Sequence, residues 1–174
     1  MALRPGLPTP EQYRQDGAVT SQLPTDLGRG AGAGLAATVV MSAVILAADK
    51  SGATPQPPPQ RITDHLLHRA GSRPSRGVRR GLGTAAHVGF GAGAGAAYAA
   101  VQGRMRLPGP PVASGVGYGL GVWAASYAGW IPALGALPPP DEDLPGRVRT
   151  MVIAHIVYGA VLGALVGRGR SPVG

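Results

Sequence analysis

The chain has 174 residues, of which 14% are charged, and its formal net charge is +8. Since about a quarter of the residues in a typical soluble domain are charged, this composition argues against an ordinary water-exposed surface. The absence of cysteine excludes disulfides and thiolate metal sites. The charged side chains gather in short stretches between long uncharged segments. This segregation predicts a protein that lies in a lipid bilayer.

The positive charge comes from fifteen Arg and one Lys, against eight acidic residues. Such an excess can indicate nucleic-acid binding. Here the arginines flank apolar segments, and no nucleic-acid motif accompanies them. We therefore expect contact with anionic lipid headgroups and no nucleic-acid partner.

Residues 1–28 are rich in Pro, Gly, Gln and Thr and predict a flexible N-terminal tail. Nineteen uncharged residues follow, from Gly30 to Ala48. Because about twenty residues of helix cross the hydrocarbon core of a bilayer, this segment predicts a first span over 30–48. A signal peptide is the alternative, and the long tail before the segment argues against it.

Residues 49–80 predict a polar, proline-containing loop. Within it, the stretch 61–69 has Ile62, Leu66 and Leu67 on one helical face. This pattern favours a short helix that lies on the membrane surface.

Three further uncharged segments predict the remaining spans. Trp130, near the end of the third, indicates a membrane interface. The acidic stretch Asp141-Glu142-Asp143 predicts a solvated loop before the fourth span. The predicted parts are spans at about 30–48, 81–103, 112–133 and 150–167, a transmembrane domain over 29–168 and a C-terminal tail over 169–174. The expected fold class is an all-α integral membrane bundle of four transmembrane helices.

The second and fourth spans contain the same sequence pattern, A-H-x-x-aromatic-G-A-x-x-G-A, at 86–96 and 154–164. The first and third agree more loosely, with Gly34 pairing with Gly119. These matches predict a two-fold pseudo-repeat of helical hairpins, related by an axis along the membrane normal. Chance similarity between Gly/Ala-rich segments is the alternative.

The repeated pattern places a small-xxx-small ridge and a histidine on one face of each even-numbered span. Small residues at such positions let helices approach closely in a membrane. The candidate helix-packing residues are Gly91, Gly95, Gly159, Gly163, Gly117 and Gly121.

His87 and His155 are candidates for polar or proton-handling roles, together with Tyr98 and Tyr158, because ionisable groups inside a membrane usually face the bundle interior. Three interpretations stay open: a structural hydrogen bond to Ser42, Ser126 or a tyrosine, a role in transport, and a metal site. Two histidines without an intramembrane carboxylate are too few ligands for a metal, so we expect neither metal nor cofactor. No catalytic arrangement is present, and we expect no enzyme.

A set of short motifs runs along residues 30–167. They are a His-aromatic-Gly helix ending in Ala97-Tyr98, then Pro108, Gly119, Trp123, Pro132-x-Leu134-Gly135, Pro138-Pro139, Leu144-Pro145 and His155. In this order the motifs resemble the YagU-like family of bacterial inner-membrane proteins. The resemblance implies a multi-pass protein of the inner membrane, in a family whose activity is not established, and it supplies no catalytic residues.

Together these features predict a structural or interaction module in the bilayer, which self-associates as a homo-oligomer or docks on a larger membrane complex. The alternative is a small transporter or channel that moves protons or small solutes through a pseudo-symmetric bundle containing the histidines.

Overall fold

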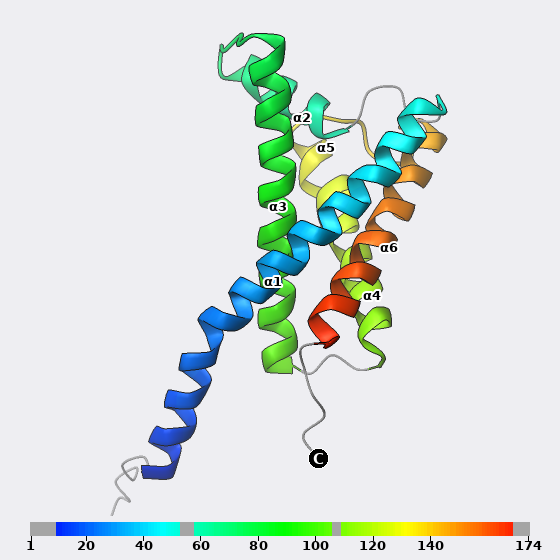
Figure 1. Cartoon of the computed structure of the whole chain (residues 1–174). Coiled ribbons are helices and arrows are strands. Elements are labelled where there is room, and N and C mark those ends of the chain that lie inside the picture. Colours follow the sequence, from blue (N-terminus) through cyan, green and yellow to red (C-terminus); the bar gives the residue numbers. More distant parts are fainter. Residues whose placement is uncertain (1–9, 53–57, 106–108, 169–174) are drawn as a thin grey trace, which may run out of the picture.

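The computed structural model describes residues 10–52, 58–105 and 109–168, and every regular element within them is a helix. The elements are α1 (Pro10–Lys50), α2 (Pro58–Arg69), α3 (Arg76–Met105), α4 (Pro111–Ala125), the π-helical turn η1 (Ser126–Trp130), α5 (Ile131–Ala133) and α6 (Pro145–Arg168). Figure 1 shows the long helices side by side, with α2 and α5 near one end of the bundle. The predicted all-α class is confirmed for these residues.

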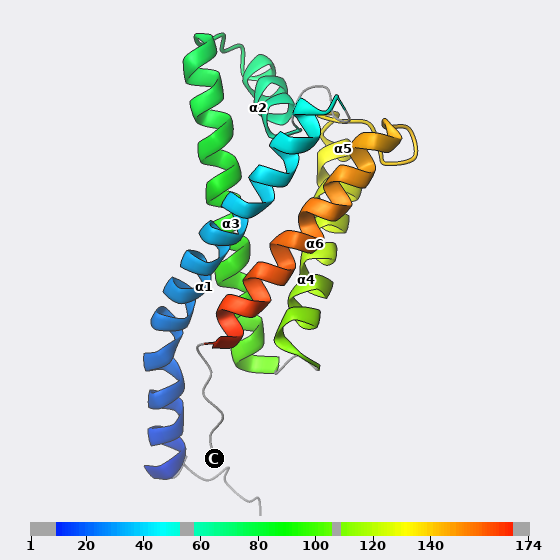
Figure 2. The ribbon, with the colours of Figure 1, turned by 45° about the vertical axis from the view of Figure 1, so that its right-hand side comes forward.

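The long helices pack as two pairs that are joined through α1. Helix α1 packs on α3, and α4 packs on α6. Helix α1 also packs along α6. The backbones of α3 and α4 approach each other at few places, but side chains link the two helices: the Tyr98 hydroxyl lies 2.9 Å from the Ser114 hydroxyl, and the Tyr118 hydroxyl donates to the Ala94 carbonyl at 2.8 Å. Figure 2 shows α1 crossing α3, with the lower end of α3 close to the ends of α4 and α6.

Helix α1 extends further toward the N-terminus than the sequence predicts. We expected a flexible tail over 1–28, but residues 10–28 are helical; residues 1–9 lie outside the described part. Proline suits the first position of a helix, where its missing N–H has no intrahelical partner, and Pro10 takes this position. The N-terminal part of α1, which contains Pro24, projects beyond the other helices (Figures 1 and 2).

The predicted third span, 112–133, is not one uniform α-helix. The α-helix ends at Ala125, and the chain continues through η1 into α5. Pro132 has no N–H to donate to the carbonyl four residues earlier, which accounts for the irregular turn before it.

Two close contacts between glycines define the helix pairs. A Cβ added at Gly34 on α1 would overlap the Gly91 carbonyl oxygen and lie 3.0 Å from the Gly95 Cα on α3. A Cβ at Gly115 on α4 would overlap the Gly159 oxygen and lie 2.7 Å from the Gly163 Cα on α6. Backbones approach this closely only where side chains are absent.

Gly34 and Gly115 thus make similar contacts, each with the carbonyl oxygen of one glycine and the Cα of a second glycine four residues later in the facing helix. The sequence comparison had paired Gly34 with Gly119, which is four residues, or about one helical turn, further along the chain. The correction arises because several glycines repeat at similar spacing along α4, so sequence similarity alone does not define the register.

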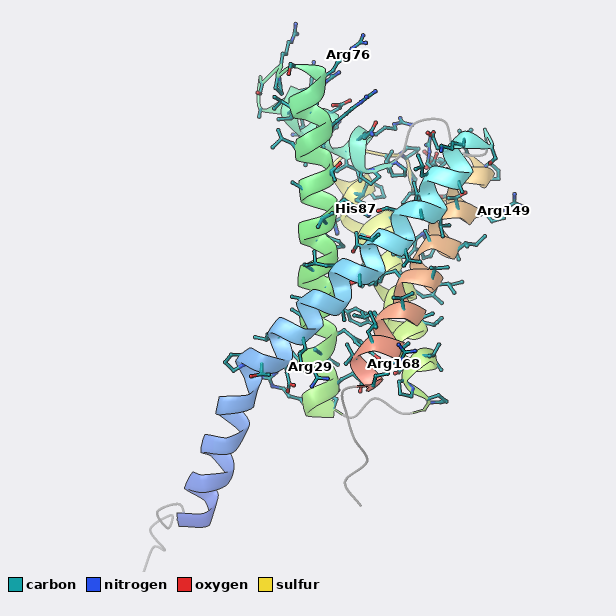
Figure 3. The ribbon with its side chains drawn as sticks, in the orientation of Figure 1. Arg29, Arg76, His87, Arg149 and Arg168 are labelled. Carbon is teal, nitrogen blue, oxygen red and sulfur yellow. The ribbon has the colours of Figure 1, made fainter. Side chains whose placement is uncertain are left out.

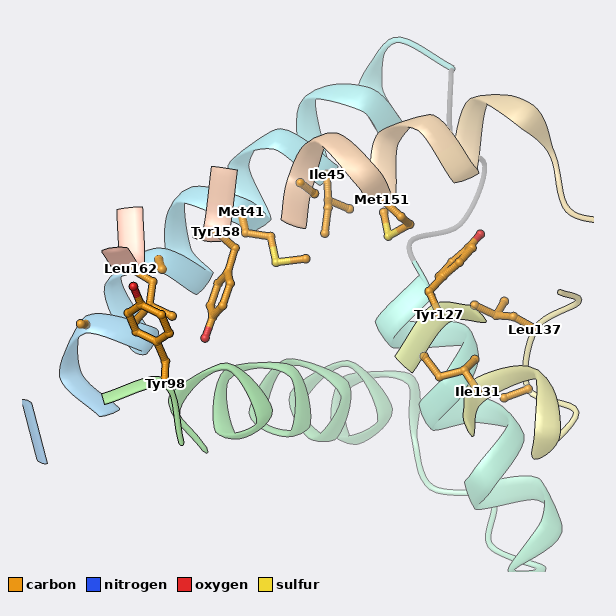
Figure 4. Packing of buried hydrophobic residues seen from close by; sticks show 13 residues of the cluster. Met41, Ile45, Tyr98, Tyr127, Ile131, Leu137, Met151, Tyr158 and Leu162 are labelled. Atoms are coloured by element: carbon orange, nitrogen blue, oxygen red, sulfur yellow. The ribbon is translucent and has the colours of Figure 1, made fainter. Parts of the chain in front are cut away.

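The interior of the bundle is filled by methionine, isoleucine, leucine and tyrosine side chains. Met41 and Ile45 of α1 and Met151 of α6 point into the space between the helices (Figure 4). Tyr158 and Leu162 continue this core toward the other end of α6, with 3% and 0% of their surfaces exposed.

Charged side chains lie near the ends of the long helices. Figure 3 shows Arg76 at the upper end of α3, Arg149 near the start of α6 at about the height of His87, and Arg29 and Arg168 together near the lower end of the bundle. Within the described residues, two helical segments are long and apolar enough to cross a membrane, namely Leu23–Lys50 and Pro145–Arg168.

Candidate functional site

A cavity of about 260 Å³ lies inside the bundle, and both predicted histidines line it. Side chains of α1, α3, η1 and α6 form its walls, and α2 supplies Pro58, Ile62 and Leu66. The short helix expected on the membrane surface is therefore present as α2, where it also covers one side of the cavity.

His155 is bonded to its own helix. Its Nδ1 lies 2.7 Å from the Met151 carbonyl oxygen. Because a carbonyl oxygen only accepts hydrogen bonds, Nδ1 carries the proton, and Nε2 of a neutral ring presents a lone pair. The hydroxyl of Ser126, one of the expected histidine partners, donates to the Val122 carbonyl at 2.6 Å.

His87 lies on α3 and points toward the middle of the bundle (Figure 3). Its Nε2 is buried and has no hydrogen-bond partner among the described residues. His87 and His155 both line the cavity. The structure thus brings the two histidines to one cavity.

The two candidate tyrosines have different places. Tyr158 lines the cavity, and its hydroxyl donates to the Gly91 carbonyl at 2.7 Å, which ties α6 to α3. Tyr98 does not line the cavity. Its hydroxyl lies 2.9 Å from the Ser114 hydroxyl and accepts a bond from the Gln102 amide at 2.8 Å. Tyr98 therefore joins α3 to α4 away from the histidines.

Four of the six candidate packing glycines lie at the helix contacts described above: Gly91, Gly95, Gly159 and Gly163. The other two, Gly117 and Gly121, have no atom of another helix within 4 Å of an added Cβ. On α4 the close contacts occur at Gly115 and Gly119 instead. Gly115 and Gly119 have the same four-residue spacing as Gly117 and Gly121. The sequence therefore could not indicate which of the two pairs contacts α6.

A buried polar cluster next to the cavity was missed from sequence. The Asp143 carboxylate accepts hydrogen bonds from the Tyr127 hydroxyl and the Arg147 guanidinium, and all three residues are at most 8% exposed. The prediction of a solvated acidic loop is therefore wrong for Asp143, although Asp141 and Glu142 are exposed. The four-residue spacing of Asp143 and Arg147 was the available signal.

The chemical capacity of the site is that of two imidazoles in a mainly apolar cavity. Such rings can accept or donate a hydrogen bond or exchange a proton. No group of three or more His, Cys, Asp or Glu side chains that could hold a metal ion occurs in the part of the chain that the structure describes.

The comparisons with known proteins give a family and no function. No curated protein and no solved structure matches the chain. No match names the YagU-like family, so that resemblance stays a prediction. A family model matches residues 24–172, which include both helix pairs and the cavity. The chain therefore belongs to a family of unknown function, DUF6789.

Proposed function

We propose that the chain is an integral membrane protein that crosses the bilayer four times, as two helical hairpins of the same orientation. The observation that supports this most strongly is the long uncharged stretch in the middle of the helices, with charged residues before and after it. We call this region the uncharged belt. Residues 81–103 of α3 contain no Asp, Glu, Lys or Arg, and 23 helical residues extend about 34 Å, enough for a hydrocarbon core of about 30 Å.

Large apolar side chains face outward along this belt. Val39 on α1 is 68% exposed, Phe90 on α3 is 48% exposed and Ile153 on α6 is 46% exposed. Within the apolar segments of α1 and α6, only 28% and 44% of the residues in an 18-residue apolar stretch are buried. An extended apolar exterior is rare in a soluble monomer, whereas lipid tails would cover it favourably.

The equivalent contacts of Gly34 and Gly115 support a duplicated hairpin. A unit of two spans returns the chain to the side where it started. Two such units therefore have the same orientation and are related by an axis along the membrane normal.

We propose further that this bundle is an interaction module, which self-associates or docks on a larger complex in the bacterial inner membrane. Exposed glycines support this role. Gly89 and Gly93 on α3, and Gly117 and Gly121 on α4, have four-residue spacing and open space beside them. Such pairs allow another membrane helix to approach closely. The resemblance to YagU-like proteins supports the choice of membrane.

Cysteine labelling tests the membrane topology, because the natural chain has no cysteine to replace. We expect Ser51→Cys and Ser72→Cys to react with an impermeant maleimide from one side of the membrane. Gly28→Cys and Gly109→Cys should react only from the other. Release of the protein by alkaline carbonate, or labelling of all four sites from one side, would contradict the four-span proposal.

Leucine substitution tests the interaction role. The double variant Gly117→Leu/Gly121→Leu should lose self-association, or recovery with a membrane complex, because the added side chains keep a partner helix away. Ala113→Leu, at another exposed position of α4, is the matched control. Equal association of both variants with wild type would refute this assignment, as would a wild-type protein that is monomeric and free of partners in native membranes.

The cavity with two imidazoles supports transport as a second candidate function. Proton flux into proteoliposomes should then be present for wild type and absent for His87→Gln/His155→Gln with unchanged folding. A wild-type protein without flux would rule out the proton pathway.

A further inference from the structure

We propose that the histidine-lined cavity binds a small, neutral aromatic molecule that carries one hydroxyl group. The inference goes beyond the interaction role, and only its route of entry rests on the proposed membrane placement. It follows from the size of the cavity, the chemistry of its walls and the polar atoms left without partners.

The size of the cavity limits the ligand. Its volume is about 260 Å³, and a protein cavity of about 150 Å³ accommodates benzene. In proportion, the space suits a molecule of about ten non-hydrogen atoms. This corresponds to one substituted ring or two small fused rings.

The walls favour an aromatic body. Phe90, Tyr127, Trp130 and Tyr158 line the cavity from α3, η1 and α6, and Met151 adds a thioether. Aromatic rings and methionine sulfur pack favourably against a further ring. No Arg, Lys, Asp or Glu belongs to the lining. An ionised ligand would therefore lose its hydration without gaining a permanent opposite charge, which favours a neutral molecule.

The hydroxyl groups of the lining already donate to protein atoms. The Thr38 hydroxyl donates to the Gly34 carbonyl at 2.7 Å, and Tyr158 and Ser126 donate to backbone carbonyls as described above. The Thr63 hydroxyl donates to the Pro59 carbonyl at 2.9 Å. Tyr127 donates to the Asp143 carboxylate.

The two imidazoles are different. Among the described residues, Nε2 of His87 has no hydrogen-bond partner, and the hydrogen bond of His155 uses Nδ1 and leaves Nε2 without one. Nε2 of His155 presents a lone pair, so it would accept a hydrogen bond from a ligand hydroxyl, whose oxygen could in turn accept one from His87. Pairing a buried nitrogen with the ligand removes the cost of leaving it without a partner.

The cavity reaches the outer surface of the bundle. Leu66, Phe90 and Trp130 line it and are 44%, 48% and 41% exposed. The Phe90 and Trp130 rings have centroids 6.3 Å apart. Leu66 belongs to α2, Phe90 to α3 and Trp130 to η1, so three elements border the opening. In a membrane this opening would face lipid, so a ligand that dissolves in the bilayer could enter from the side.

Tryptophan fluorescence can test the proposal, since the chain has two tryptophans and only Trp130 lines the cavity. The protein is placed in lipid nanodiscs, with Trp123→Phe as the reporter variant and Trp130→Phe as the control. The probe is 4-bromophenol, whose bromine quenches a nearby indole. The matched probe is 4-bromotoluene, which has a methyl group in place of the hydroxyl.

We expect saturable quenching of Trp130 by 4-bromophenol, and only weak, non-saturable quenching of Trp123. The dissociation constant of 4-bromotoluene should be about tenfold higher than that of 4-bromophenol. This factor corresponds to the loss of one net hydrogen bond of about 1.4 kcal/mol. His155→Leu should weaken 4-bromophenol binding by a similar factor and leave 4-bromotoluene unaffected. His68→Leu, an exposed histidine of α2, should change neither.

Equal affinity for the two probes would overturn the proposal, because the imidazoles would then contribute nothing to binding. Equal quenching of both tryptophans would also overturn it, because the probe would be dissolved in lipid and not bound in the cavity. The comparison of probes uses the wild-type histidines, so it decides the question even if His155→Leu fails to fold. Neither result depends on self-association through the exposed glycines of α3 and α4 (Gly89, Gly93, Gly117 and Gly121).

Discussion

Substitution of Gly115 by alanine tests the helix register most directly. The new Cβ would overlap the Gly159 carbonyl oxygen and lie 2.7 Å from the Gly163 Cα. Both are backbone atoms that cannot rotate away, so α4 and α6 must separate. Gly117→Ala is the matched control two residues along the same helix, because its Cβ would meet nothing within 4 Å.

The expected magnitude follows from comparing the two variants. Replacing glycine by alanine inside a helix contributes about 1 kcal/mol of helix propensity at either position. This contribution cancels in the difference. The remaining term is overpacking at Gly115, which typically costs about 1–3 kcal/mol. Gly115→Ala should therefore be less stable than Gly117→Ala by about 1–3 kcal/mol.

The assay is reversible unfolding in mixed micelles with increasing SDS, followed by circular dichroism. Equal unfolding midpoints for Gly115→Ala and Gly117→Ala would refute the α4–α6 register. The same comparison in the first hairpin uses Gly34→Ala and Gly32→Ala, since an added Cβ at Gly32 also meets nothing within 4 Å. If the hairpins are duplicates, the two differences should be similar in size.

Three further substitutions test contacts of the site. Tyr158→Phe should lower the free energy of unfolding by about 1 kcal/mol in the same assay, because it removes the bond to the Gly91 carbonyl. Asp143→Asn should lower the free energy of unfolding by about 3 kcal/mol, because it removes a buried carboxylate that accepts hydrogen bonds from Tyr127 and Arg147. The matched control Asp141→Asn, at an exposed position, should change it by less than about 0.5 kcal/mol. His65→Leu should increase proteolysis around α2, because it removes the 3.0 Å contact of Nε2 with the Leu134 carbonyl, and unchanged cleavage would argue against docking of α2 through this residue.

The polar cluster shows why burial is difficult to predict for a single charged residue. Asp143 stands among prolines and two other acidic residues, which is typical of a solvated loop. It is buried because the start of α6 places Arg147 beside it and η1 places Tyr127 opposite. The first contact is local, and sequence spacing can indicate it. The second joins segments 16 residues apart and depends on the turn before α5.

The sequence by itself determined the features that depend on local composition. Uncharged segments of helical length between arginines predicted the long helices, and the repeated pattern placed His87 and His155 at equivalent positions. Only the tertiary structure decided which faces of those helices meet. Glycines recur along α3 and α4, so their spacing does not show which of them face another helix. An added Cβ would overlap backbone atoms of α6 at Gly115 but would meet nothing at Gly117, which identifies the face of α4 that packs on α6. The cavity depends on the same choice, because it is bounded by segments that become neighbours only when the helices pack.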